Sequence, residues 1–168
     1  MVVKTEITIE ELTEIATDFL RENYGMELGI PIKRNNRLRR VQGRFHASFT
    51  NESQLIDIAG FVFKYGTRDS VIDTLKHELI HYALLERDEP NDDGHPHFEA
   101  ELRKHGVGST KSNIIGLRYV AKCTGCGDNT YGRNKRIALP NQRFTSRCCR
   151  KPVNYVGERI YNGTEALK

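Results

Sequence analysis

Apolar residues recur every three or four positions in three stretches of the first 106 residues, and this spacing predicts three helices. The first helix follows the capping-box pattern Thr8-Ile9-Glu10-Glu11 and ends at Gly25. The second begins after a cap at Thr67 or Asp69 and runs to the polar loop before the third. The third has Pro96 in its first turn, where a proline costs no helical hydrogen bond.

Three segments before the second helix are short and rich in strand-forming residues, with turn-forming Asn and Gly residues between them: Leu28–Lys33, Leu38–Phe49 and Gln54–Tyr65. From Gly108 onward the pattern changes to turns, basic residues and short apolar stretches. We therefore predict an α+β fold, with helices packed on a small sheet in residues 1–110 and a smaller β module in residues 111–168.

The chain has 168 residues, which is enough for one hydrophobic core. It contains no run of 18 apolar residues, and its N-terminus lacks the apolar segment of a secretory signal. We expect a cytoplasmic protein with no membrane association, and a monomer. Four cysteines in such a protein favour a metal site over disulfides.

The net charge of +4 conceals a strong asymmetry along the chain. Residues 1–100 contain 12 Lys and Arg against 18 Asp and Glu, whereas residues 101–168 contain 14 against 4. All four cysteines lie in this basic portion. The asymmetry indicates two regions with different binding partners, although an excess of lysine and arginine also serves solubility.

The sequence His77-Glu78-Leu79-Ile80-His81 lies within the second predicted helix. The spacing of four places both imidazoles on one helix face, where they can bind the same metal ion. Zinc suits imidazole ligands and keeps an open position for water when the protein supplies three ligands. Glu78 is then the candidate general base.

The residues leave the third ligand open, with candidates at His95, His97, Glu101 and His105. Leu84 occupies the position at which a metzincin has glycine, so that family is excluded. Glu101 would be a ligand in a thermolysin-like arrangement. His105 could instead cap the end of its helix, where its charge would interact with the helix dipole.

The motif His77–Tyr82, the later run Asp93-Gly94-His95-Pro96-His97-Phe98 and the cysteine-bearing basic tail together resemble the SprT-like metalloprotease family. The resemblance covers roughly residues 8–160. It implies a zincin-like catalytic domain with helices packed on a small mixed sheet, and a zinc-ribbon-like C-terminal module. It also implies His95 as the third zinc ligand, with His97 in reserve. It also implies proteolysis of DNA-associated or DNA-crosslinked proteins.

Cys123-Thr124-Gly125-Cys126 has the spacing of a zinc knuckle. The second pair, Cys148 and Cys149, is adjacent in sequence, and neighbouring side chains usually diverge. Four thiolates can meet there only if the backbone is kinked. We predict a second, structural zinc at Cys123, Cys126, Cys148 and Cys149, and a ribbon held by packing or partial ligation is the alternative.

Basic and aromatic residues alternate around the cysteines, as in sites that bind phosphates and stack unpaired bases. We predict contacts with DNA, single-stranded or without sequence preference, from six basic residues: Arg133, Lys135, Arg136, Arg147, Arg150 and Lys151. Two functions follow. The first is a zinc peptidase that uses Glu78, and the second is a non-catalytic zinc-containing nucleic-acid-binding regulator. Glu78 favours the peptidase, since a structural zinc requires no carboxylate at that position.

Overall fold

The first helix of the computed structural model, α1 (Ile9–Tyr24), is capped as the sequence predicts. The model describes residues 6–48, 53–108, 114–133, 135–139, 143–163 and 166–167. Thr8 Oγ1 accepts a hydrogen bond from Glu11 N at 3.1 Å, and Gly25 ends the helix in the left-handed conformation, with φ of 64°. The capping residues therefore define this helix locally.

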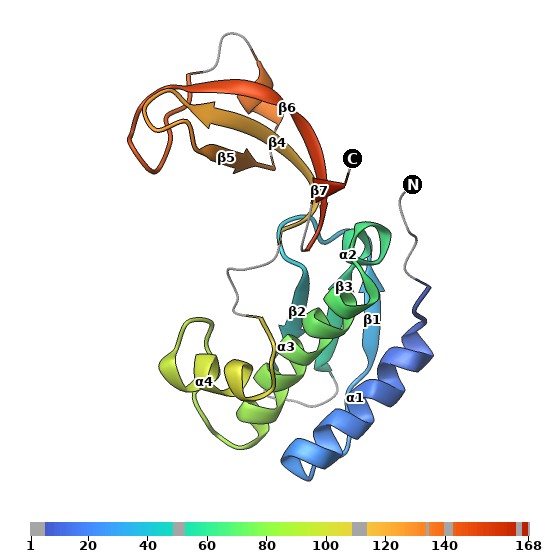
Figure 1. Cartoon of the computed structure of the whole chain (residues 1–168). Helices are drawn as coiled ribbons and strands as arrows, with labels where there is room; N and C mark the ends of the chain where they lie inside the picture. Colours follow the sequence, from blue (N-terminus) through green and yellow to red (C-terminus); the bar gives the residue numbers. More distant parts are fainter. Residues whose placement is uncertain are drawn as a thin grey trace.

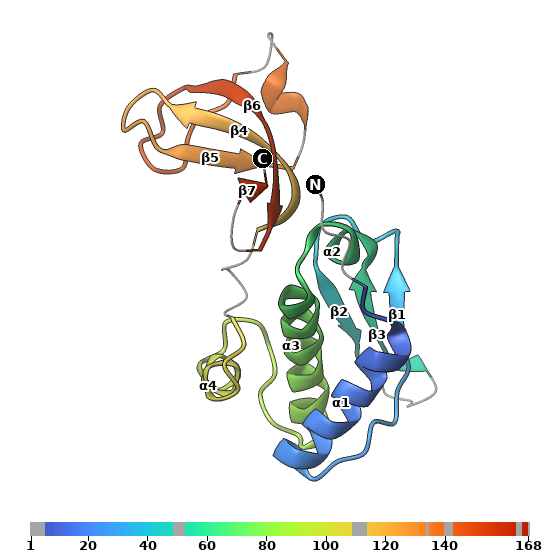
Figure 2. The ribbon, with the colours of Figure 1, turned by 45° about the vertical axis from the view of Figure 1, so that its right-hand side comes forward.

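Three short strands form the first sheet, which has the order β1-β3-β2. They are β1 (Ile32–Asn35), β2 (Gly43–His46) and β3 (Leu55–Ala59). The central strand β3 pairs in parallel with β1 and antiparallel with β2, so the sheet is mixed as predicted. Helices α1 and α3 (Arg68–Glu86) cover one face of it (Figures 1 and 2).

The segment Gln54–Tyr65 is not one strand, and the single-strand prediction for it is wrong. Strand β3 ends at Ala59, and the chain continues as helix α2 (Gly60–Tyr65). A Cβ atom at position 60 would lie 1.9 Å from Asn36 Oδ1, so glycine lets the turn after β1 pack against the start of α2. Propensity and apolar content do not reveal this contact between segments distant in sequence.

Helix α3 is buried on several sides, because it packs against α1, the first sheet and α4 (Pro96–Lys104). Thr67 is its N-cap and accepts a hydrogen bond from Ser70 N at 3.1 Å. Six of its apolar side chains are completely or almost completely buried in the core: Val71, Leu75, Leu79, Ile80, Ala83 and Leu84. The helix that contains the histidine motif is thus a central, buried element of the fold.

The C-terminal part forms an antiparallel four-stranded sheet of order β5-β4-β6-β7. Its two long strands are β4 (Ile115–Cys123) and β6 (Val153–Asn162), and the edge strands are β5 (Asn129–Gly132) and β7 (Ala166–Leu167). A short 3-10 helix, η2 (Lys135–Ala138), follows β5. The predicted boundary between residues 110 and 111 lies outside the described residues.

The second sheet contacts the first part of the chain through α2, which packs against β4 and β6. Ser70 Oγ donates to the carbonyl oxygen of Asn162 at 3.0 Å, and the Arg133 guanidinium donates to the carbonyl oxygens of Arg39 and Arg40. These contacts bring the second sheet beside the N-terminal end of α3. Among the described residues, no helix combines the length and apolar character needed to cross a membrane.

Candidate metal centre

The two histidines of the motif face a common point from successive turns of α3. His77 Nε2 and His81 Nε2 are 3.2 Å apart, and both rings pack on Phe98 of α4, which is completely buried. The His81 ring is stacked on the Phe98 ring, with centroids 4.0 Å apart. Phe98 therefore packs against both imidazoles, a contact that the sequence motif did not reveal.

The side chain that completes this group is Asp93, in the loop between α3 and α4. Asp93 Oδ1 lies 3.2 Å from His77 Nε2 and 3.3 Å from His81 Nε2, so the three atoms form a nearly equilateral triangle. Ligands about 2.0–2.1 Å from a tetrahedral zinc lie about 3.3–3.4 Å from one another. The donor set and its geometry therefore fit zinc.

Both imidazoles are prepared for metal binding by their surroundings. His81 Nδ1 is 2.5 Å from the carbonyl oxygen of Asn91 and donates its proton there, which leaves Nε2 as the ligand atom. Burial lowers the pKa of His77 and of His81. The lower pKa favours the neutral imidazole, the form that binds a metal.

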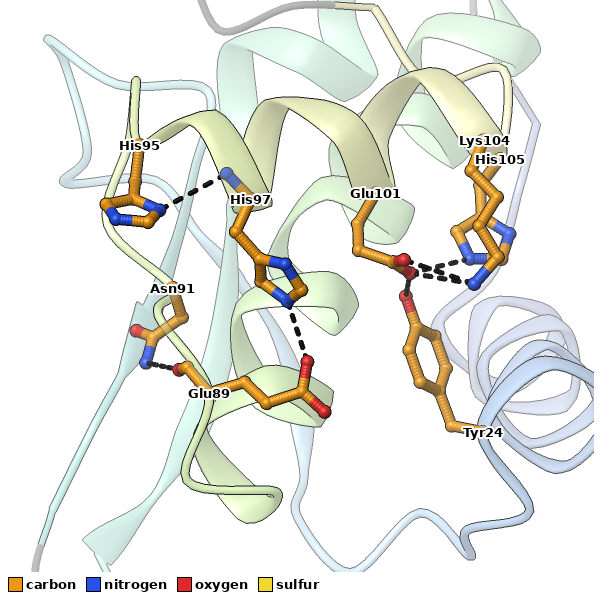
Figure 3. A network of polar contacts seen from close by, with 8 residues as sticks. All are labelled: Tyr24, Glu89, Asn91, His95, His97, Glu101, Lys104 and His105. Atoms are coloured by element: carbon orange, nitrogen blue, oxygen red, sulfur yellow. Dashed lines mark hydrogen bonds and ion pairs between the residues drawn. The ribbon is translucent and has the colours of Figure 1, made fainter.

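The structure does not place His95 or His97 in this group. His95 is exposed at the N-cap of α4, where its Nδ1 accepts a hydrogen bond from His97 N at 3.2 Å (Figure 3). His97 Nε2 pairs with Glu89 Oε2 at 2.7 Å. Among the described residues, the histidines and the acidic side chain that meet at one point are His77, His81 and Asp93.

Glu101 and His105, the other two candidates, belong to a separate network that ties α4 to α1. Glu101 Oε2 accepts a hydrogen bond from the Tyr24 hydroxyl at 3.0 Å, and Glu101 also pairs with Lys104 and His105 (Figure 3). The His105 ring packs against the Phe19 and Tyr24 rings. This network is structural, and it holds α4 in the position that places Phe98 under the two histidines.

Glu78 is buried beside the metal centre, at 7% exposure, and strand β2 positions its carboxylate. Phe45 N donates to Glu78 Oε2 at 2.8 Å. Burial raises the pKa of Glu78 to about 8, and the hydrogen bond from Phe45 opposes this shift. A divalent cation on the neighbouring histidines would favour the ionised form that a general base requires.

Residues 9–114 match the family described as the SprT-like family. The chain belongs to the SprT-like family. The matched region contains α1, the first sheet, the histidine motif and Asp93. This SprT-like chain therefore has a metallopeptidase-like domain, and the candidate metal centre lies within it. A comparison with curated proteins returns no match.

A cleft of about 670 Å³ opens beside the metal centre of this SprT-like chain. One wall consists of residues 40–43 and of α3, including His77 and Glu78. The other wall comes from the C-terminal part of the chain and includes Arg118 of β4, Tyr131 of β5, Arg133 and Arg147. The sequence reasoning did not predict that the basic module would line the same cleft as the histidine motif.

The four cysteines of the second sheet meet at one point, with their sulfur atoms within 4.8 Å of one another. Cys123 is buried at the end of β4, and Cys126 Sγ lies 3.4 Å from Cys148 Sγ. Four thiolates about 2.3 Å from a tetrahedral zinc are about 3.8 Å apart, so this donor set also fits zinc. The cluster supports the prediction of a structural metal site.

Ser146 resolves how two adjacent cysteines reach one site. Ser146 is 3% exposed, and its hydroxyl oxygen accepts hydrogen bonds from Cys149 N at 3.4 Å and from Lys151 N at 3.3 Å. Arg150, the residue after the cysteine pair, has a positive φ of 54°, so the chain turns sharply directly after Cys149. The same hydroxyl lies 3.1 Å from Cys123 Sγ and lowers the pKa of the Cys123 thiol. In the sequence, a serine two residues before the cysteine pair was a signal from which this hydrogen-bonded loop could have been predicted.

The six basic residues proposed for nucleic acid do not form one equivalent set. Arg133 is bound to backbone carbonyl oxygens of residues 39 and 40, and together with Arg147 it lines the cleft. The other four are exposed on η2 and on residues 146–151, the cysteine loop that carries Cys148 and Cys149: Lys135, Arg136, Arg150 and Lys151. DNA binding by these residues stays a prediction.

Proposed function

We propose that the chain is a zinc-dependent peptidase whose metal ligands are His77, His81 and Asp93 and whose general base is Glu78. The observation that carries the proposal is the triangle of two imidazole nitrogens and one carboxylate oxygen, with sides of 3.2, 3.2 and 3.3 Å, next to a buried carboxylate. Three protein ligands leave a tetrahedral ion one open position.

Zinc held there would polarise the scissile carbonyl and lower the pKa of the attacking water. Phe45 N holds Glu78 Oε2, so Oε1 takes the proton from the water and then donates it to the leaving amine nitrogen. Burial of Glu78 limits competing hydration of the carboxylate. His77 and His81 stay neutral throughout and serve as ligands.

Strand β2 is the edge at which an extended peptide would bind. Strand β3 is central and is paired on both sides, so it has no free edge for a peptide. The Gln42 carbonyl oxygen accepts from Ala59 N, and strand alternation then directs the backbone groups of Val41 and Gly43 away from β3. Both residues line the cleft, where a substrate strand would form hydrogen bonds with them.

Glu78→Gln tests the mechanism. We expect the variant to keep its zinc and to lose cleavage of a peptide substrate by about 10²–10⁴-fold, since it keeps the hydrogen bond from Phe45 N but cannot accept a proton. Zinc content is measured by elemental analysis, and kcat/KM by a fluorogenic peptide assay. The matched control is Glu86→Gln, which makes the same change at an exposed carboxylate on the same helix. A Glu78→Gln variant that cleaves at the parent rate overturns the mechanism.

The resemblance to DNA-directed proteases extends the proposal to substrates associated with DNA. The exposed cations on η2 and on the cysteine loop support this extension, since they lie on the module that lines the cleft. Charge removal at Lys135 and Arg136 should reduce the salt dependence of binding to an oligonucleotide. An unchanged salt dependence would remove DNA from the proposal and leave the peptidase intact.

A further inference from the structure

Arg118 is a buried cation in the cleft. It lies on β4, is 8% exposed and lines the same cleft as His77 and Glu78. Its guanidinium donates to the carbonyl oxygen of the neighbouring Leu117 at 2.9 Å. Among the described residues no carboxylate pairs with it. A buried charge without a counter-ion is costly to a fold, which indicates that the arginine is retained for an anion.

The neighbours of Arg118 across the sheet are also arginines. Arg118 is directly opposite Arg159 of β6, and continuation of the β4–β5 register from the Tyr119–Gly132 pair places Arg133 on its other side. Directly opposed like charges destabilise a sheet. The hydrogen bonds of Arg133 to the carbonyl oxygens of residues 39 and 40 hold this cation at the cleft.

The acidic groups of the cleft lie on its other wall. Asp73 and Glu78 are on α3, and Asp93 is among the proposed metal ligands. The cleft therefore has a cation-binding wall at the metal centre and a cationic wall on the second sheet. A substrate that spans the cleft would place its scissile carbonyl at the metal centre and a negatively charged group beside Arg118.

We propose that Arg118 binds a carboxylate of the substrate, so that the cleft selects peptides with an acidic side chain near the scissile bond. The inference rests on the proposed peptidase function and adds its substrate class. A guanidinium pairs with a carboxylate through two parallel hydrogen bonds. A peptide carboxylate is favoured over a nucleic-acid strand because Arg118 is reached from within the cleft, whereas a polyanion would lie on the exposed cations of the cysteine loop.

Binding is measured in the full-length, zinc-loaded chain with Glu78→Gln, which separates binding from cleavage. The probes are two fluorescent peptides of Gly and Ala that differ only in one central residue, Glu in one and Gln in the other. We expect the Glu peptide to bind about 10–100-fold more tightly. Adding Arg118→Gln should abolish this difference, and Arg118→Lys should retain part of it. Arg103→Gln, an exposed arginine on α4, removes the same charge outside the cleft and should leave the difference intact.

Thermal denaturation shows whether Arg118→Gln folds. If Arg118→Gln does not fold, the partial preference expected of Arg118→Lys for the Glu peptide tests the inference instead. Equal affinity of the parent for the two peptides overturns the inference, as does a preference that survives in Arg118→Gln. A labelled oligothymidylate that binds more tightly than both peptides and depends on Arg118 also overturns it in favour of a phosphate site. If the unmutated chain cleaves no peptide while the preference for Glu persists, the peptidase function fails and the carboxylate site stands.

Discussion

Replacement of Gly43 by alanine should disable the catalytic carboxylate without touching it chemically. A Cβ atom at this position would lie 2.7 Å from Glu78 Oε1, 2.8 Å from Glu78 Cγ and 2.9 Å from Thr74 Cγ2. Ordinary van der Waals contact begins at 3.4 Å, so the carboxylate or strand β2 must move by about 0.7 Å. Gly43 lies outside the left-handed region, so the substitution adds no backbone strain.

The expected effect follows from this displacement. Overpacking of a buried site costs about 1–3 kcal/mol, which lowers the melting temperature of a chain of this size by about 2–12 °C. A shift of the base approaching 1 Å reduces kcat/KM by about 10²-fold. The assay is peptide cleavage by the zinc-loaded variant, alongside thermal denaturation and zinc content, which should stay at the parent level.

Gly29→Ala is the matched control. Its Cβ would meet the Tyr82 hydroxyl oxygen at 3.4 Å, an ordinary contact, so activity and melting temperature should match those of the parent. The reasoning is refuted if Gly43→Ala retains full activity and stability. Loss of zinc in Gly43→Ala would show that the substitution acts on the ligands and not on Glu78.

Three further predictions concern the metal sites and the α1–α4 contact. Asp93→Ala should lose the catalytic zinc, and His95→Ala should keep it, as measured by elemental analysis; the opposite result would make His95 the third ligand. Cys148→Ser should reduce the zinc content by one equivalent and spare the catalytic ion. Ser146→Ala should keep both ions but lower the melting temperature by several degrees, since the amide groups of the cysteine loop lose their hydrogen-bond acceptor. A Ser146→Ala variant as stable as the parent would rule out this role for the hydroxyl. Tyr24→Phe should cost about 1 kcal/mol of unfolding free energy in a denaturant titration, since Glu101 loses one donor; an unchanged midpoint would show that packing alone holds α4.

Local sequence patterns predicted the parts of this protein that depend on near neighbours. The capping box at Thr8 and the spacing of His77, Glu78 and His81 translate directly into helix geometry, because positions one turn apart share a face whatever surrounds the helix. The spacing of Cys123 and Cys126 likewise predicted a knuckle on a turn. The α+β class follows from the same periodicities, whereas the mixed sheet was implied by the family resemblance.

Contacts between distant segments decided the remainder. The loop before α4 brings Asp93 to the histidines while His95 caps the helix, and no spacing rule distinguishes these two neighbours. The turn after β1 packs against Gly60, the position at which the apparent strand gives way to helix α2. The docking of the second sheet places Arg118 in the cleft of α3. The sequence by itself determined the paired histidines, the candidate base Glu78 and the four cysteines, because their chemistry resides in residue type and local spacing. Only the tertiary structure brought Asp93 to the two histidines, because that meeting depends on the packing of elements far apart in the chain.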